Sequence, residues 1–226
     1  MSPGAPIRHA LIFAAGIGER MRPLTNTTPK PLLRVRGKHL IEYHLEKLAI
    51  AGVHEVVINT SHLAEQFPEA LGDGARWGMR IHYSYEGPTA LETGGGMLHA
   101  LPLLGSDPFI VVNGDIYCNL DFLKLPRVPS GLAHLVVVDN PPHYPQGDFV
   151  LRDGLLRDEA APRLTFAGIG VYRPQLLAQL RHGRFSIVPT LRAAMGAGQI
   201  SGEHYLGVWA DIGTPQRLAE LRAKLA

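Results

Sequence analysis

Short apolar runs alternate with stripes of helical period in the first half of the chain. Ala10 to Ala15 and Val53 to Thr60 are apolar runs of the length and bulk of buried strands. Between them, His39 to Ile50 places apolar residues on one helix face, and Gly52 provides an end signal. This strand–helix–strand order predicts parallel strands joined by a right-handed crossover.

The alternation continues along the chain and predicts the fold class. Further strands are expected at Arg80 to Tyr85, Phe109 to Val112, Leu132 to Val138, Thr165 to Tyr172 and a segment through Trp209. Further helices are expected at His62 to Leu71, Met97 to Leu104, Pro174 to Arg181, Val188 to Met195 and after Thr214, with Thr214 as N-cap and Pro215 as the first helical residue. We therefore predict an α/β fold with an open, mostly parallel central sheet flanked by helices. No linker or low-complexity segment divides residues 1–226, so a single domain is expected, without a C-terminal acyltransferase or hexapeptide-repeat domain.

The composition argues against several classes of binding partner. The chain has 46% hydrophobic and 19% charged residues with a net charge of +2, and no block of like charge marks a nucleic-acid-binding surface. No apolar stretch is long enough to span a bilayer, so no membrane partner is expected. The single cysteine, Cys118, cannot form an internal disulfide, which fits a cytoplasmic location. The histidines show no metal-binding spacing, so zinc is not expected.

The first apolar run leads into a glycine-rich, cationic segment. Gly16 and Gly18 can adopt positive φ and leave backbone N–H groups uncovered, which suits phosphate oxygens. Arg20 follows, and Lys30 stands between two prolines that restrict its backbone. The segment is neither a P-loop nor a dinucleotide fingerprint, since the third glycine of the latter is replaced by Met21. A tight turn alone would leave the cations unexplained, so we predict a site that holds a polyphosphate.

Polar residues and glycines at the expected strand ends complete this prediction. Gly16, Glu86, Gly94 and Asp115 each follow an expected strand, and ligands of open parallel sheets bind at that edge. Asp115 stands in an N-G-D turn and Asp211 in W-A-D-I-G-T. Either aspartate alone is typical of a turn or helix cap. Two of them in a chain with the phosphate-binding segment favour Mg²⁺, which prefers oxygen ligands.

These motifs resemble a known enzyme family. The string G-x-G-x-R-M-x-P-L-T with P-K-P, the N-G-D turn and D-x-G-T resemble the signature of the sugar-1-phosphate nucleotidyltransferases, which make nucleoside-diphosphate sugars. The resemblance implies a Rossmann-like (GT-A-like) fold and a nucleoside triphosphate and a sugar-1-phosphate as substrates. It implies Arg20 and Lys30 as catalytic cations, with Mg²⁺ on Asp115 and Asp211. A monomer or small homo-oligomer is expected.

The same resemblance assigns binding positions. The nucleotide would be bound by Ala15, Gly16, Gly18, Glu19, Arg20, Lys30, Glu86, Gly94 and Asn113. The sugar would be bound by Gly147, Glu159 and Gly168. The chain would then consist of a nucleotide-binding half, about 1–118, and a sugar-binding half, about 119–226.

One branch of the family matches further. G-x-G-E-R-M-R-P-L-T, L-I-E-Y-H-L, L-E-T-G-G-G and P-Q-G-D-F resemble small bacterial members that join UTP and N-acetylmuramate 1-phosphate, giving UDP-N-acetylmuramic acid and pyrophosphate in peptidoglycan recycling. The lactyl carboxylate of that sugar needs a cation or N–H donors, and Arg163 or Arg173 could supply one. One alternative is a mannose- or glucose-1-phosphate nucleotidyltransferase that uses GTP or dTTP. Another is a non-catalytic nucleotide-sensing module, against which the retention of Lys30 and both aspartates argues.

Overall fold

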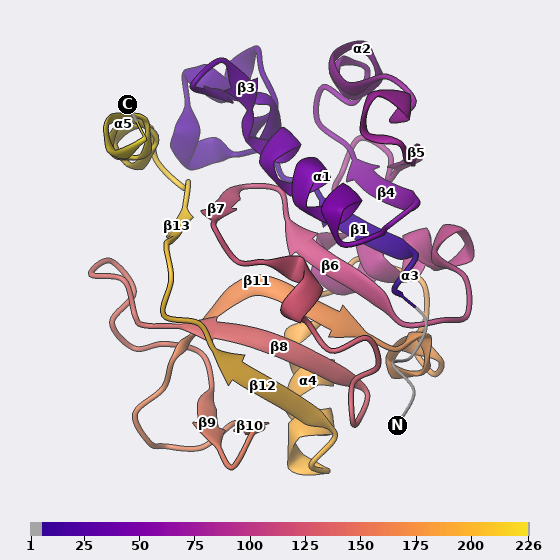
Figure 1. Cartoon of the computed structure of the whole chain (residues 1–226), viewed down its shortest axis with the longest axis vertical. Coiled ribbons are helices and arrows are strands. Elements are labelled where there is room, and N and C mark those ends of the chain that lie inside the picture. The colour runs from indigo at the N-terminus through magenta and orange to yellow at the C-terminus, as the bar shows by residue number, and fades with distance from the viewer. Residues whose placement is uncertain (1–5, 226) are drawn as a thin grey trace.

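A nine-stranded sheet forms the centre of the protein, which the computed structural model describes over residues 6–225 (Figure 1). Its first part contains four neighbouring parallel strands, in the order β5 (Arg80–Tyr85), β4 (Glu55–Thr60), β1 (His9–Phe13) and β6 (Phe109–Asn113). β1, β4 and β6 are apolar along most of their length because helices cover both faces of this part of the sheet, whereas β5 lies at its edge and alternates apolar and polar residues. All four were predicted from the sequence.

Strand directions are mixed in the second part of the sheet. β11 (Thr165–Tyr172) is antiparallel to both β6 and β8 (Ala133–Val138), and β12 (Ile200–His204) is parallel to β8. β10 (Leu155–Arg157) and β9 (Val150–Arg152) form an edge hairpin. The sequence did not predict β12 or the hairpin, because their short segments lack a clear apolar alternation. The predicted α/β fold, with a sheet that is mostly parallel in its core, is confirmed.

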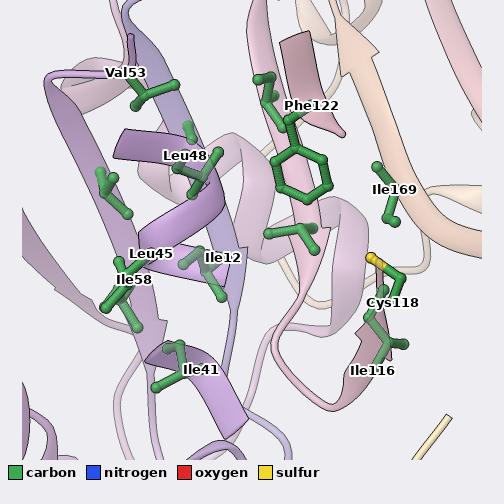
Figure 2. Packing of buried hydrophobic residues seen from close by; sticks show 14 of the residues in the cluster. Ile12, Ile41, Leu45, Leu48, Val53, Ile58, Ile116, Cys118, Phe122 and Ile169 are labelled. Atoms are coloured by element: carbon green, nitrogen blue, oxygen red, sulfur yellow. The ribbon is translucent and has the colours of Figure 1, made fainter. Parts of the chain in front are cut away.

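Helices cover the two faces of the sheet. α1 (Leu40–Ile50) and α2 (Gln66–Leu71) pack on one face, in a hydrophobic cluster in which Leu45 and Leu48 of α1 lie near Ile12 of β1 (Figure 2). The opposite face is covered by α3 and α4, with the bounds Glu92–Leu104 and Val188–Gly196. Alternate residues of β1 enter the two clusters, as the period of a strand requires.

Two small antiparallel pairs and the last helix complete the fold. β2 (Arg34–Val35) pairs with β3 (Lys38–His39), and β7 (Ile116–Cys118) pairs with β13 (Trp209–Asp211). α5 (Pro215–Lys224) follows β13 and packs in a third cluster with residues of the N-terminal region. The Oγ1 of Thr214 accepts a hydrogen bond from the backbone N–H of Arg217 at 3.3 Å, so the predicted N-cap is confirmed.

Several helix predictions need correction. The helix expected from Met97 begins at Glu92, because the preceding glycines belong to its first turns. The helix expected at His62 to Leu71 is only α2, and that expected at Pro174 to Arg181 is one short 3-10 turn. The 3-10 helices are Glu19–Met21, Leu24–Asn26, Lys30–Leu32, Ala75–Trp77, Phe122–Lys124 and Pro174–Leu177. Within residues 6–225 no helix has the length and apolarity to cross a membrane.

Candidate active site

The carboxyl ends of β1, β4 and β6 open on a first cavity of about 300 Å³. Six of the residues predicted for the site line it, namely Ala15, Gly16, Lys30, Glu86, Asn113 and Asp115. They come together because parallel strands bring their carboxyl ends to one edge of the sheet. The predicted strand-end rim is therefore present, apart from Gly94.

The two glycines after β1 serve different purposes. Gly18 has φ +70°, and a Cβ there would lie 2.9 Å from the Cγ2 of Thr25, so the turn requires glycine. Gly16 does not have positive φ, and a Cβ on it would meet nothing within 4 Å. Gly16 thus leaves its backbone open to the cavity, as close approach of a ligand requires.

A second cavity of about 510 Å³ adjoins the same segment. Gly18, Glu19 and Arg20 line it, together with Lys30, which also lines the first cavity. Arg184, from the segment before α4, lines it as well and forms an ion pair of 3.2 Å with Glu92. Several cations therefore surround a space that could take the phosphates of a nucleotide. Sequence analysis missed Arg184, which lies far along the chain from the glycine-rich segment.

Lys30 and Asp115 form an ion pair. The Nζ of Lys30 lies 2.7 Å from the Oδ2 of Asp115, and the lysine side chain is only 13% exposed. The backbone N–H of Gly114 donates to the carbonyl oxygen of Phe13 at 2.9 Å, which holds the N-G-D turn against the end of β1. The predicted cation and the first predicted metal ligand are thus direct neighbours.

Asp211 lies beside this pair. The backbone N–H of Ile212 donates to the carbonyl oxygen of Asp115 at 2.8 Å, which joins the two aspartate segments. A third cavity, of about 380 Å³, is lined by both aspartates and by Arg20. The Nη1 of Arg217 donates to the Oδ2 of Asp211, and the Nε2 of His143 lies 3.0 Å from its Oδ1. Sequence analysis missed Arg217 and His143.

Both carboxylate oxygens of Glu86 accept hydrogen bonds from other groups of the protein. Its Oε1 accepts a hydrogen bond from the Nδ2 of Asn59, and its Oε2 from the backbone N–H of Leu91, both at 2.6 Å. Burial raises the pKa of the Glu86 carboxyl. Asn59 also accepts a bond of 2.7 Å from the backbone N–H of Ala14. Glu86 thus supports the wall of the first cavity. The missed Asn59 could have been recognised as the one amide in the apolar run of β4.

The glycine cluster after β5, Gly94 to Gly96, packs against other parts of the protein. The N–H groups of Gly94 and Gly95 donate to the carbonyl oxygen of Phe185 at 2.9 and 3.1 Å. A Cβ on Gly94 would overlap the Phe185 ring, and one on Gly96 would overlap the Glu86 carboxylate. Gly94 therefore lies off the rim where it was predicted, because close packing with the segment before α4 takes up its N–H.

Only one of the three residues predicted for the sugar site lines the third cavity. Gly168, with φ +74°, lines the third cavity and packs against Asn113, which leaves no room for a Cβ. Gly147 packs instead between Asn140 and the backbone of Arg163, away from the third-cavity wall. Glu159 follows the edge hairpin and does not line that wall.

Glu159 and the two arginines suggested for the sugar site contact other protein groups. Glu159 forms ion pairs with Arg152 at 3.2 Å and Arg157 at 3.9 Å. Arg163 pairs with Asp158 at 3.0 Å, and Arg173 donates to the Pro129 carbonyl at 3.0 Å. Neither Arg163 nor Arg173 lines the third cavity, whose wall contains Tyr144, Thr165 and Phe166 instead.

Comparison with known proteins agrees with this arrangement. The family model described as "Nucleotidyl transferase" matches residues 9–139. The chain is 48% identical over 223 residues to the N-acetylmuramate alpha-1-phosphate uridylyltransferase of Neisseria meningitidis serogroup B, covering 95% of this chain and 96% of that protein. It is 34% identical to the protein of the same name from Caulobacter vibrioides, covering 96% of each. The structure of the inositol-1-phosphate CTP transferase from T. maritima has a TM-score of 0.82 at 19% identity, covering 98% of this chain and 97% of that one, and shares the fold. The chain belongs to the nucleotidyltransferase family.

Proposed function

We propose that the chain transfers a uridylyl group from UTP to N-acetylmuramic acid 1-phosphate, giving UDP-N-acetylmuramic acid and pyrophosphate. The names of its two bacterial relatives support this choice of substrates. The observation that carries the chemistry is the ion pair of Lys30 and Asp115. Asp115 lines the third cavity together with Arg20 and Asp211. We place the reaction in the cytoplasm, in peptidoglycan recycling, and propose that a monomer or small homo-oligomer performs it.

The proposed reaction needs charge and position more than a base. The attacking group is a sugar phosphate, which is largely dianionic at neutral pH because its second pKa is about 6. The difficulty lies in bringing two anions together and stabilising pyrophosphate as it leaves. Arg20 would hold the β- and γ-phosphates through the fork of its guanidinium, and Lys30 would place a point charge at the reacting phosphates. Backbone N–H groups from Ala15 to Gly18 would bind further phosphate oxygens.

Asp115 and Asp211 would hold Mg²⁺. The fit is supported by two carboxylates that line one cavity and that already lie beside cationic groups of the protein, Lys30 and Arg217. Among the described residues no three acidic, histidine or cysteine side chains gather to hold a metal. This agrees with Mg²⁺, which binds through one or two carboxylates and takes its other ligands from water and substrate phosphates. When bound, it would neutralise negative charge on the reacting phosphates.

The two parts of the sheet suggest a division of labour. We propose that residues 1–118 form the nucleotide-binding half, because they contain the first cavity and most of the second. Residues 119–226 would select the sugar, because most of the third-cavity wall comes from them.

Pyrophosphate release tests the proposal. UTP, dTTP, GTP, CTP and ATP are each combined with the 1-phosphates of N-acetylmuramate, N-acetylglucosamine, glucose and mannose in the presence of Mg²⁺. The highest kcat/KM is expected for UTP with N-acetylmuramate 1-phosphate. A preference for GTP or dTTP with mannose or glucose 1-phosphate would overturn the choice of substrates. Release with no combination would contradict nucleotidyl transfer itself.

A further inference from the structure

A fourth cavity, of about 610 Å³, lies beside the third. The walls of the two cavities have four residues in common, Pro141, His143, Trp209 and Asp211. The fourth cavity is bounded by the loop after β8 that contains Pro141 and Pro142, by β13 and by α5. A sugar whose phosphate reaches the two aspartates therefore has the fourth cavity next to it, on the side of α5.

Arg217 stands at the boundary between the two cavities. Its Nη1 donates to Asp211 and lies 2.7 Å from the Nε2 of His143, while its Nε donates to the Oγ1 of Thr214 at 3.4 Å. Only 16% of its side chain is exposed. A Cβ on Gly213 would lie 2.5 Å from its Nη2, so the guanidinium rests directly on the glycine backbone. The Nη2 donates to none of the residues that the structure describes, and can serve a ligand.

The charges around Arg217 favour an anionic ligand. Asp211 balances this guanidinium in the protein alone, but under the proposed function the same carboxylate holds a divalent ion. A largely buried cation that shares its counterion with a metal ion is stabilised by a second anion. The other acidic residue of the fourth cavity, Glu220, already accepts a hydrogen bond from Gln216 at 2.9 Å. A carboxylate on the ligand would match the planar fork of Arg217.

We propose that Arg217 determines the sugar specificity by binding the lactyl carboxylate of N-acetylmuramate 1-phosphate, with His143 beside it. This inference rests on the proposed function. The lactyl ether is what distinguishes this substrate from N-acetylglucosamine 1-phosphate, so a residue that binds its carboxylate separates the two. Arg217 takes the role that the sequence suggested for Arg163 or Arg173, which lie outside the walls of both cavities.

The test compares the two sugar phosphates on one enzyme preparation. We measure kcat/KM with UTP and Mg²⁺ for N-acetylmuramate and N-acetylglucosamine 1-phosphates and take the ratio, which does not depend on the folded fraction. Arg217→Gln should lower the ratio about ten- to hundredfold, the range of a hydrogen bond to a charged group. Arg217→Lys should fall between, because it keeps the charge and loses the fork. Arg222→Gln is the matched control: Arg222 lies on the same helix and donates to the Arg34 carbonyl instead, so the ratio should not change.

The outcomes separate this inference from the proposed function. A wild-type preference for the muramate sugar that Arg217→Gln abolishes supports the inference. An unchanged ratio overturns it, and so does an equal loss with both sugars, because that would assign Arg217 to the phosphate or to Asp211. A wild-type enzyme that does not use the muramate sugar overturns the proposed function as well. Calorimetric titration of UDP-N-acetylmuramic acid and UDP-N-acetylglucosamine, without turnover, should show the same loss of discrimination in Arg217→Gln.

Discussion

The two sides of the candidate site are built differently. On the nucleotide side, side chains extend from the ends of buried parallel strands and are tied by short bonds, as in the chain of contacts from Ala14 through Asn59 to Glu86. On the sugar side, the wall comes from β11, β13 and the loop after β8, with contacts such as the 2.9 Å bond between Tyr144 and Asp148. The difference suggests that a rigid edge holds the group common to all nucleotide donors, while a wall built partly from a loop selects the acceptor.

The largest effect is expected at the rigid edge. Lys30→Ala should lower turnover about 100- to 1000-fold, because it removes a fixed charge from the reacting phosphates. Lys38→Ala, which removes an exposed lysine paired with Glu46 at 2.6 Å, is the control and should leave turnover nearly unchanged. Steady-state pyrophosphate release measures both. Near-normal turnover of Lys30→Ala would break the assignment of the nucleotide side.

A buried histidine should make the same edge sensitive to acid. The Nε2 of His44 in α1 lies 2.8 Å from the carbonyl oxygen of Ile116, and burial lowers the His44 pKa from 6.5 to about 4. The neutral form is favoured in the folded state, so stability is full above pH 6.5 and falls as the pH drops toward 4. The loss should reach roughly 3 kcal/mol.

Urea unfolding between pH 7.5 and 4 measures this loss. His44→Gln keeps an N–H donor without a titrating group and should flatten this part of the pH dependence. The same slope in the wild type and in His44→Gln would assign acid sensitivity to other groups.

Two glycines of the nucleotide side offer a sharper test of how it is built. Gly94→Ala should lower the free energy of unfolding by about 1–3 kcal/mol, because the new methyl group would overlap the Phe185 ring. Gly16→Ala should leave stability nearly unchanged, since no atom lies within 4 Å of the added carbon, and should raise the KM for UTP. Urea unfolding and initial rates distinguish these effects. The reverse pattern would mean that Gly94, rather than Gly16, faces the nucleotide.

The sequence predicted the site best where a local motif marks the end of a strand, because the sheet then determines where that motif lies. The apolar run of β1 and the N-G-D turn after β6 each mark a strand end, and a parallel sheet brings such ends together, so Gly16 and Asp115 could be predicted on one edge. Lys30 was predicted from the cationic segment after β1, and its ion pair with Asp115 brings it to that edge. Asp211 was found through its motif, although its place depends on the pairing of β13 with β7.

The missed cations have no local signal of this kind, unlike Asn59, which is the one amide in the apolar run of β4. Arg184 and Arg217 are single cations in ordinary segments, and only the path of the chain brings them to the site. Gly94 shows the opposite error: its cluster looks like a ligand-binding turn, but the close approach that requires glycine is that of the Phe185 segment. A glycine pattern indicates that something approaches closely without identifying it.

The smallest effect is expected at Glu159, on the sugar side. Its carboxylate pairs with Arg152 and Arg157 and is 39% exposed, so Glu159→Gln should change stability by less than about 1 kcal/mol. The KM for the sugar phosphate should change less than about threefold, the size expected of a side chain outside the cavity wall. Thr165→Val, at the third cavity, is the contrasting variant and should raise that KM more. A tenfold rise for Glu159→Gln alone would mean that Glu159 reaches the sugar, as the family resemblance implied, and that the edge hairpin closes over it. The loops of the sugar side would then close on the acceptor during binding, while the strand ends of the nucleotide side stay in place.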